Sequence, residues 1–486
     1  MPVWIAGALV LALILRIPWL GVGLGNDEGG LTYLAGAWND DGPFAYGDYF
    51  IDRPPVLLAL FRLAGMTGGT ASVRTMGVVA VLGLVLVTSL LARQIAGDRA
   101  AGWAAVLTAG LGSSAAIGSV FTPAELLAVV PSALSVLMVW KGLSETRPRP
   151  GFLAVAGALG VGALLVKQSF GDALVAGLVC LAASAVLERH SGRALAVAGG
   201  AYLAGALVAV GALEVWESAA GIPDGSMSYA MLEFRLDGLS ALAGSAGGLP
   251  GRFAERLVVP LVLSGLLVVL WWSASGLRKL RSDRVAAWTL GAWGAAGGIA
   301  VMAGGSYWAH YLIQLIPFAA VTASLALAAT STRAARITVA ALAACAIGGV
   351  TLGPSTVKAE GVPAGVIGTY LKSNAHRGDT AHVLYSQANV LYYSGLRDPF
   401  PYNWSLMMRA VPRAEAKLRS LLASPRRPTW IVRWEPLRAY NLDRDGTTKR
   451  LLDRNYRSVG TICGTPVLVR KAVERSLPPP PAGGCS

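Results

Sequence analysis

Long apolar runs constrain this chain more than any other feature of its sequence. A helix needs about 20 predominantly apolar residues to cross the hydrocarbon core of a bilayer. Only 14% of the 486 residues are charged, whereas soluble domains contain about 25%, so a soluble surface cannot cover these runs. We therefore expect an all-α polytopic membrane domain over residues 1–353, with about 11 transmembrane helices. The runs span residues 2–25, 73–95, 101–120, 123–142, 151–166, 171–188, 195–216, 257–274, 285–303, 309–330 and 335–353.

Basic residues predict the orientation of these spans. Every second short loop carries Arg or Lys, and the positive-inside rule places such loops in the cytoplasm. The alternate loops, among them 26–72 and 217–256, should face outward, as should everything after about residue 354. An odd number of spans then gives a cytoplasmic N-terminus and an extracytoplasmic C-terminal region. Cys463 and Cys485 could pair only if that region is outside the cytoplasm.

The first apolar run is expected to stay in the mature protein. It lacks a basic n-region and a small-residue cleavage site, so we interpret it as a span of a multi-pass plasma-membrane protein and not as a signal peptide. The Ala-, Gly- and Arg-rich, Lys-poor composition is typical of a high-GC bacterium.

The sequence changes character after residue 353. Residues 380–396 and 427–434 read as short buried strands, and residues 412–424 read as an amphipathic helix between them. We expect a small extracytoplasmic α/β domain over residues 354–475. The Pro-rich end, residues 476–486, is predicted to be disordered.

The outer loop 26–72 combines acidic and aromatic residues. Asp27 and Glu28 directly follow the first apolar run, with glycines on both sides that would let a substrate approach the backbone, although a simple loop tolerates them as well. An apolar segment at 55–66 is too short to span and should lie in the interface. Carboxylates and aromatic rings together suit a sugar or polyol. The alternative is a solvated loop whose aromatic residues form an interfacial belt.

Two motifs in this loop carry a resemblance to a known superfamily. An Asp-Glu pair is followed by "YGDYFIDRPP", which contains Tyr46, Asp48 and Arg53, and then by Arg74 before the next span. This order resembles the polyprenyl-phosphate-dependent GT-C glycosyltransferases (glycosyltransferase family 39). It is closest to the branch of the protein O-mannosyltransferases and the lipid A aminoarabinose transferases.

Three further segments resemble that branch in the same order along the chain. "TPAELLAVVP" (122–131) is similar to its acidic start of the fourth span. "LLVKQSFGDAL" (164–174) resembles its L-x-K-G segment, with Gln168 in place of the glycine, and "HYLIQLIPFAAV" (310–321) resembles its H-Y-x-x-x-x-x-P segment. The likeness covers residues 1–353 and, more loosely, the C-terminal region.

The resemblance implies a glycosyltransferase that uses a polyprenyl-phosphate-sugar donor, with a hexosyl or pentosyl group transferred. A hydroxyl of an envelope glycan, lipid or protein would attack the anomeric carbon at the outer face, with inversion. Because lipid phosphate leaves readily once its charge is met, the site needs a base for the acceptor proton and cations for the phosphate.

Asp27 is the predicted base, because partial desolvation at the membrane edge makes a carboxylate a better proton acceptor. Glu28 is predicted to orient Asp27 or to contact the sugar. The alternative is that both acids cap the following helix, whose first turn favours negative charge.

Three cations are predicted to bind the donor phosphate. Arg53 is the first candidate because a guanidinium offers forked donors to oxyanions; the alternative is an anchor to lipid headgroups. Lys167 and His310 are the other two. Glu125 could also belong to a capping box that starts at Thr122. The predicted substrate-binding residues are Tyr46, Asp48, Glu125 and Tyr311.

Other chemistries are less consistent with the sequence. No His or Cys cluster has metal-ligand spacing, so we expect no metal and no cofactor, the one alternative being a divalent cation on Asp27 and Asp52. Basic residues are not interleaved with aromatics, so nucleic acid is not an expected partner. One rival function is a transporter or lipid flippase, which would show inverted repeats and broken helices near the bilayer midplane; neither is clear. The other is a membrane scaffold of the same fold without catalysis.

Overall fold

The computed structural model describes most of the chain. The described residues are 3–38, 45–144, 147–187, 189–243, 251, 253–330, 332–481 and 483–485. Asp40 and Asp41 of the acidic outer loop lie outside them.

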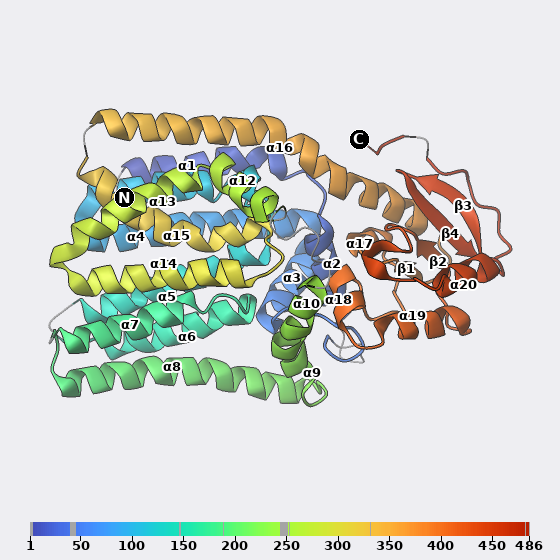
Figure 1. Ribbon diagram of the computed structural model, residues 1–486, viewed down its shortest axis with the longest axis horizontal. Helices are drawn as coiled ribbons and strands as arrows, with labels where there is room; N and C mark the ends of the chain where they lie inside the picture. Colours follow the sequence, from blue (N-terminus) through green and yellow to red (C-terminus); the bar gives the residue numbers. More distant parts are fainter. Residues whose placement is uncertain are drawn as a thin grey trace.

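Each of the eleven apolar runs is helical over most or part of its length in the described residues. The long helices lie side by side as a bundle (Figure 1). The helices that contain these runs are α1 (Val3–Arg16), α4 (Thr70–Leu111), α5 (Ala124–Leu143), α6 (Pro150–Val166), α7 (Asp172–Val186), α8 (Gly192–Ala219), α12 (Val259–Leu263), α13 (Leu266–Lys279), α14 (Arg284–Ala303), α15 (Ile316–Ala328) and α16 (Thr332–Asn374). The prediction of an all-helical polytopic membrane domain is therefore confirmed.

The number of spans stays a prediction. Within the described residues, five helices are long and apolar enough to cross a bilayer, and six if the pair Ala254–Leu263 and Leu266–Ser282, bent by 72°, counts as one span. Helix α4 contains two of the expected runs. Its backbone leaves the helical conformation at Ala96 and Gly97, and the Thr88 and Thr108 hydroxyls, one from each half, lie 2.8 Å apart. The two halves therefore fold back on each other.

Short helices gather at one end of the bundle, between it and the C-terminal domain (Figure 1). The first outer loop supplies α2 (Asn26–Gly36) and α3 (Pro55–Thr67), which confirms the helix expected at 55–66. The loop after α8 supplies α9 (Ser226–Ser228), the π-helix η3 (Tyr229–Glu233) and α10 (Phe234–Ala243). The remaining short turns are η1 (Ile17–Trp19), η2 (Ala115–Ile117), the π-helix η4 (Ala254–Val258), η5 (Leu280–Ser282) and η6 (Ala309–Leu315).

The C-terminal region forms an α/β domain around a four-stranded sheet of order β1-β2-β4-β3. β1 and β2 are parallel, and the other neighbours are antiparallel. The strands are β1 (Ala381–Val383), β2 (Trp430–Val432), β3 (Tyr456–Ile462) and β4 (Thr465–Arg470), and the helices are α17 (Asn389–Ser394), α18 (Ser405–Ala410), α19 (Ala414–Ala423), η7 (Ala439–Asn441) and α20 (Thr447–Asn455).

The strand expected at 427–434 and the helix expected at 412–424 are present as β2 and α19. The strand expected at 380–396 is only partly correct, because β1 ends at Val383 and residues Asn389–Ser394 form α17 instead. β3 and β4 were not predicted. They form a hairpin whose two-residue turn, Cys463-Gly464, has positive φ at both positions, as a twisted hairpin favours. Cys463 is disulfide-bonded to Cys485. The Tyr370 hydroxyl donates to the Pro478 carbonyl at 2.8 Å, so the described part of the Pro-rich end is tethered to the domain.

Candidate functional site

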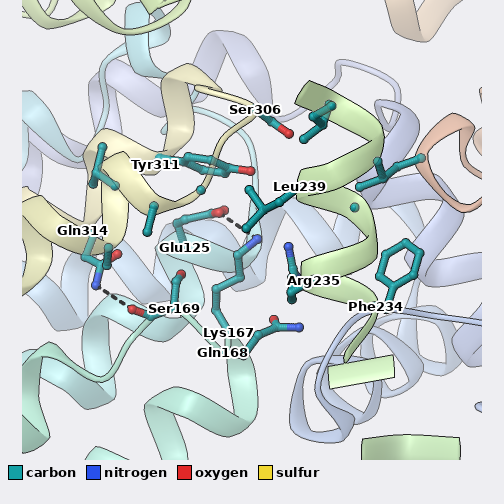
Figure 2. Close-up of a pocket in the computed structure, with 17 residues that line it drawn as sticks. Glu125, Lys167, Gln168, Ser169, Phe234, Arg235, Leu239, Ser306, Tyr311 and Gln314 are labelled. Carbon is teal, nitrogen blue, oxygen red and sulfur yellow. Dashed lines mark hydrogen bonds and ion pairs between the residues drawn. The ribbon is translucent and has the colours of Figure 1, made fainter. Parts of the chain in front are cut away.

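A cavity of about 250 Å³ lies at the end of the bundle where the short helices gather. Small and aliphatic residues of α10 and α14, including Leu239 and Val301, form its apolar wall. Its polar side chains come from α5, α10, η6 and the turns after α6 and α14 (Figure 2). They belong to Glu125, Lys167, Gln168, Ser169, Arg235, Ser306, Tyr311 and Gln314. An apolar wall beside a charged group suits a ligand that has both characters.

Two of the predicted site residues, Lys167 and His310, meet at Glu125, which lines this cavity. The Lys167 ammonium lies 2.9 Å from Glu125 Oε1, and His310 Nε2 lies 3.8 Å from the same oxygen. Lys167 also sits over the Tyr311 ring, 5.6 Å from its centre. The alternative interpretation, a capping box that starts at Thr122, does not form, because the Thr122 hydroxyl donates to the Val73 carbonyl at 2.8 Å. Glu125 is thus a partner of the lysine.

A row of alternating charges leads from the cavity to Asp27. Arg235, which lines the cavity, lies 3.4 Å from Asp52 Oδ2, and Arg53 Nη1 lies 2.5 Å from Asp52 Oδ1. The other terminal nitrogen of Arg53 lies 3.9 Å from Asp27 Oδ2. Arg53 therefore pairs with carboxylates of its own loop. We call Asp52, Arg53, Glu125, Lys167 and Arg235 the cavity cluster.

The charged groups of this cluster shift one another's pKa values. Burial alone would raise the pKa of Asp52, but attraction to Arg53 and Arg235 holds it below its ordinary value. Burial lowers the pKa of Lys167, and repulsion from the same two arginines adds to that effect against the pull of Glu125. Two arginines and a lysine so close together favour an anion, which would relieve their repulsion.

Asp27 lies in the first turn of α2, and 47% of its side chain is exposed. Its Oδ1 accepts a hydrogen bond of 2.9 Å from the indole nitrogen of Trp404, a residue of the C-terminal domain. Its Oδ2 faces Arg53. The predicted base therefore has one oxygen held by a neutral donor and the other beside a cation, within reach of an incoming acceptor.

Glu28 points the other way, into the bundle, and its side chain is 6% exposed. It forms an ion pair with buried Arg74 and accepts hydrogen bonds from the backbone N–H groups of Thr122 at 2.7 Å and Gly25 at 3.1 Å. The Gly25 contact caps α2, as the alternative interpretation held. Arg74 also donates to the Val22 carbonyl at 3.2 Å, so these contacts tie α4 to the turn before α2, to α2 itself and to the segment before α5.

Two further predicted residues lie apart from the cavity lining. Tyr46 is buried, and its hydroxyl donates to the Arg53 carbonyl at 2.5 Å, so it supports the backbone of that arginine. Asp48 is exposed on the same loop. Gln168, which departs from the family pattern, donates to the Asp52 carbonyl at 2.9 Å and so links the loop after α6 to the first outer loop.

Sequence reasoning missed Arg235 and Trp404. Arginine in an outward loop is unusual under the positive-inside rule, and this signal could have drawn attention to Arg235. Trp404 gave no local signal, because its partner Asp27 lies 377 residues away in the sequence.

Among the described residues, one group of acids is close enough to hold a metal ion: Glu415, Asp443 and Asp445. It lies in the C-terminal domain, and Arg419 pairs with all three at 2.6 to 3.7 Å. The two acids considered for a cation, Asp27 and Asp52, both contact Arg53.

Comparisons with known proteins give matches in structure and none in sequence. No family model matches the chain, and no curated protein matches it significantly. The structure of ArnT from Cupriavidus metallidurans bound to undecaprenyl phosphate aligns with a TM-score of 0.60 at 16% identity, covering 97% of this chain and 98% of that one. Its apo form aligns with a TM-score of 0.58 at 14% identity, covering 96% and 97%.

A second protein has the same architecture. The archaeal oligosaccharyltransferase AglB from Archaeoglobus fulgidus, in complex with an inhibitory peptide and a dolichol-phosphate, aligns with a TM-score of 0.53 at 14% identity, covering 98% of this chain and 74% of that one. Both neighbours belong to the GT-C superfamily. Over nearly its whole length, the chain has the GT-C fold, with a polytopic helical membrane domain and a C-terminal α/β domain.

Proposed function

We propose that this chain is a membrane glycosyltransferase. It transfers a sugar from a polyprenyl-phosphate carrier to a hydroxyl of a cell-envelope glycan, lipid or protein. The observation that carries the proposal is the row of charges from Arg235 through Asp52 and Arg53 to Asp27, which begins in a partly apolar cavity and ends at an accessible carboxylate. The neighbours solved with undecaprenyl phosphate and dolichol-phosphate support a lipid-linked donor.

Each part of the row has a role in the proposed reaction. The phosphate of the donor binds to Arg53, Arg235 and Lys167, while its isoprenoid chain follows the apolar wall of α10 and α14. Developing negative charge on the leaving phosphate is stabilised by these cations, which are held in place before the reaction. Tyr311 and His310, beside Lys167 and Glu125, complete the phosphate and sugar contacts.

Asp27 accepts the proton of the acceptor hydroxyl as that oxygen attacks the anomeric carbon. The carbon–oxygen bond to the acceptor forms as the bond to the phosphate breaks, and the carrier leaves as polyprenyl phosphate. Attack on the face opposite the phosphate inverts the configuration. Tyr46 and Asp48 belong to the loop that carries Arg53, and the Tyr46 hydroxyl holds the Arg53 backbone through its hydrogen bond to the Arg53 carbonyl.

We place the reaction at the outer face of the plasma membrane, with the N-terminus in the cytoplasm. The Cys463–Cys485 disulfide supports an extracytoplasmic C-terminal domain, because disulfides persist in oxidising compartments. The site lies at the same end of the bundle as this domain (Figure 1).

A deletion strain complemented with Asp27→Asn tests the function. We expect transfer to fall by a factor on the order of 10² to 10⁴, the usual contribution of a general base. Mass spectrometry of the envelope should then show an accumulated polyprenyl-phosphate-sugar and a glycan, lipid or protein that lacks the corresponding sugar. Asp98→Asn is the matched control, since Asp98 is an exposed acid paired with Arg93 outside the site.

Two outcomes contradict this assignment. Full complementation by Asp27→Asn would show that Asp27 is not the base. A transporter or flippase would move the lipid-linked sugar across vesicles without any new glycosidic bond, and purified protein in proteoliposomes distinguishes that activity from transfer.

A further inference from the structure

We infer that the C-terminal α/β domain completes the active site and that Trp404 is the positioning residue for the Asp27 carboxylate. This inference rests on the proposed function, because it takes Asp27 to be the base. It adds a residue from the far end of the chain to a site that is otherwise built by the membrane domain and its loops.

The contact itself assigns different tasks to the two carboxylate oxygens of Asp27. An indole N–H can only donate, so Oδ1, which accepts from Trp404 at 2.9 Å, is occupied. Oδ2 is then the oxygen left to take a proton, and it is the one that faces Arg53. Trp404 thereby directs the basic oxygen toward the cation that is proposed to hold the donor phosphate.

The helix that carries Asp27 is shaped to receive the C-terminal domain. A Cβ atom added at Gly29 would lie 2.4 Å from Asn389 Cβ, and one at Gly30 would lie 2.7 Å from Trp404 Cζ2 and 2.8 Å from Ala388 Cβ. Real Cβ atoms do not approach so closely. The glycines beside the acidic pair, which the sequence suggested as room for a substrate, instead make room for α17 and Trp404.

Hydrogen bonds to the residues just before these two glycines fix the contact. The Ala388 N–H donates to Asn26 Oδ1 at 2.9 Å, and the Asn389 side chain donates to the Leu24 carbonyl at 3.1 Å. The Leu24 N–H in turn donates to the Tyr393 hydroxyl at 2.6 Å. Residues 24–30 are therefore held by the C-terminal domain along their whole length, and the position of Asp27 depends on it.

Trp404→Phe tests the inference, because it removes the N–H and keeps an aromatic ring. The probe is the lipid-linked sugar purified from the deletion strain. We expect kcat to fall about tenfold, the usual loss for a group that orients a catalytic residue, while the donor KM stays within twofold. In an Asp27→Asn background, Trp404→Phe should cause no further loss, since the two residues act as a unit.

Trp430→Phe is the matched control. Trp430 also donates to an aspartate, Asp379 at 3.3 Å, but within the sheet and away from the site. This variant should keep its kcat even if its Tm falls. Gly30→Ala is a second test that leaves Trp404 unchanged and displaces its ring, and it should reproduce the loss of kcat without adding to that of Asp27→Asn.

The outcomes separate this inference from the function on which it rests. A wild-type kcat in both Trp404→Phe and Gly30→Ala, with Asp27→Asn inactive, overturns the role of Trp404 alone. Losses that multiply in the double variant also overturn it, because Trp404 would then act elsewhere. Full transfer by Asp27→Asn overturns the assignment of the base itself.

Discussion

Two groups of buried charges lie at the same end of the bundle. They differ in whether their charged groups are bonded to the backbone or line a cavity. In the junction cluster, Arg16, Glu28 and Arg74, the guanidinium groups donate to backbone carbonyls of the turns around them; Arg16, for example, bonds Gly112 at 3.2 Å and Val120 at 3.1 Å. In the cavity cluster, Glu125, Lys167 and Arg235 line an open cavity. The first arrangement holds helices together, and the second can accept a ligand.

Two residues that are adjacent in the sequence contact different clusters. Glu28 joins the junction cluster and Asp27 leads to the cavity cluster. Successive residues of a helix point about 100° apart, so neighbours in the first turn of α2 cannot share a direction. Adjacent carboxylates can therefore take opposite roles, and we assign Glu28 to the structure and Asp27 to the reaction. Variants that affect one cluster and spare the other test this division.

Glu28→Gln should have the largest effect on stability. It leaves the Arg74 guanidinium buried without its counter-charge, which costs about 3 to 5 kcal/mol. Thermal unfolding of the purified protein in detergent measures this loss, with Asp98→Asn as the exposed control. Molecules that remain folded should keep their kcat. A variant with normal stability and lost transfer would instead place Glu28 in the chemistry.

Gly29→Ala should have an intermediate effect. The added methyl group meets Asn389 Cβ and Cα at 2.4 and 2.9 Å, so it forces the C-terminal domain away from α2 at a cost of about 1 to 3 kcal/mol. Gly36→Ala, at the other end of the same helix with open space around it, should stabilise the protein by about 0.5 to 1 kcal/mol. Equal unfolding temperatures for the two variants would refute this tight contact.

The smallest expected effect is a pH dependence of donor binding. Because the pKa of Lys167 is lowered, this side chain loses its charge at a lower pH than an ordinary lysine. Binding of a polyprenyl methyl phosphate, whose charge stays constant, should weaken about fivefold as pH rises through that pKa, the value of about one ionic contact. Lys167→Arg should abolish the change. A titration that is identical in both proteins would exclude Lys167 from the phosphate site.

The sequence predicted the fold well because apolar length and charge asymmetry are local properties of each segment. It also brought together Glu125, Lys167, His310 and Tyr311, although only through the order of family-like motifs. The direction of Glu28 depends on where α2 begins, and the partners of Asp27 depend on how distant segments pack. Arg235 and Trp404 belong to segments with no regular pattern, so no local rule could have placed them beside residues of the first loop.

The bond between Asp27 and Trp404 also orders events during the synthesis of the protein. Ribosomes add roughly 5 to 20 residues per second. Trp404 lies 377 residues after Asp27, so it is synthesised on the order of half a minute later. During that interval the bundle can insert into the bilayer while Asp27 has no indole to hold it. A chain that stops before residue 404 would thus be an assembled membrane protein whose proposed active site lacks Trp404.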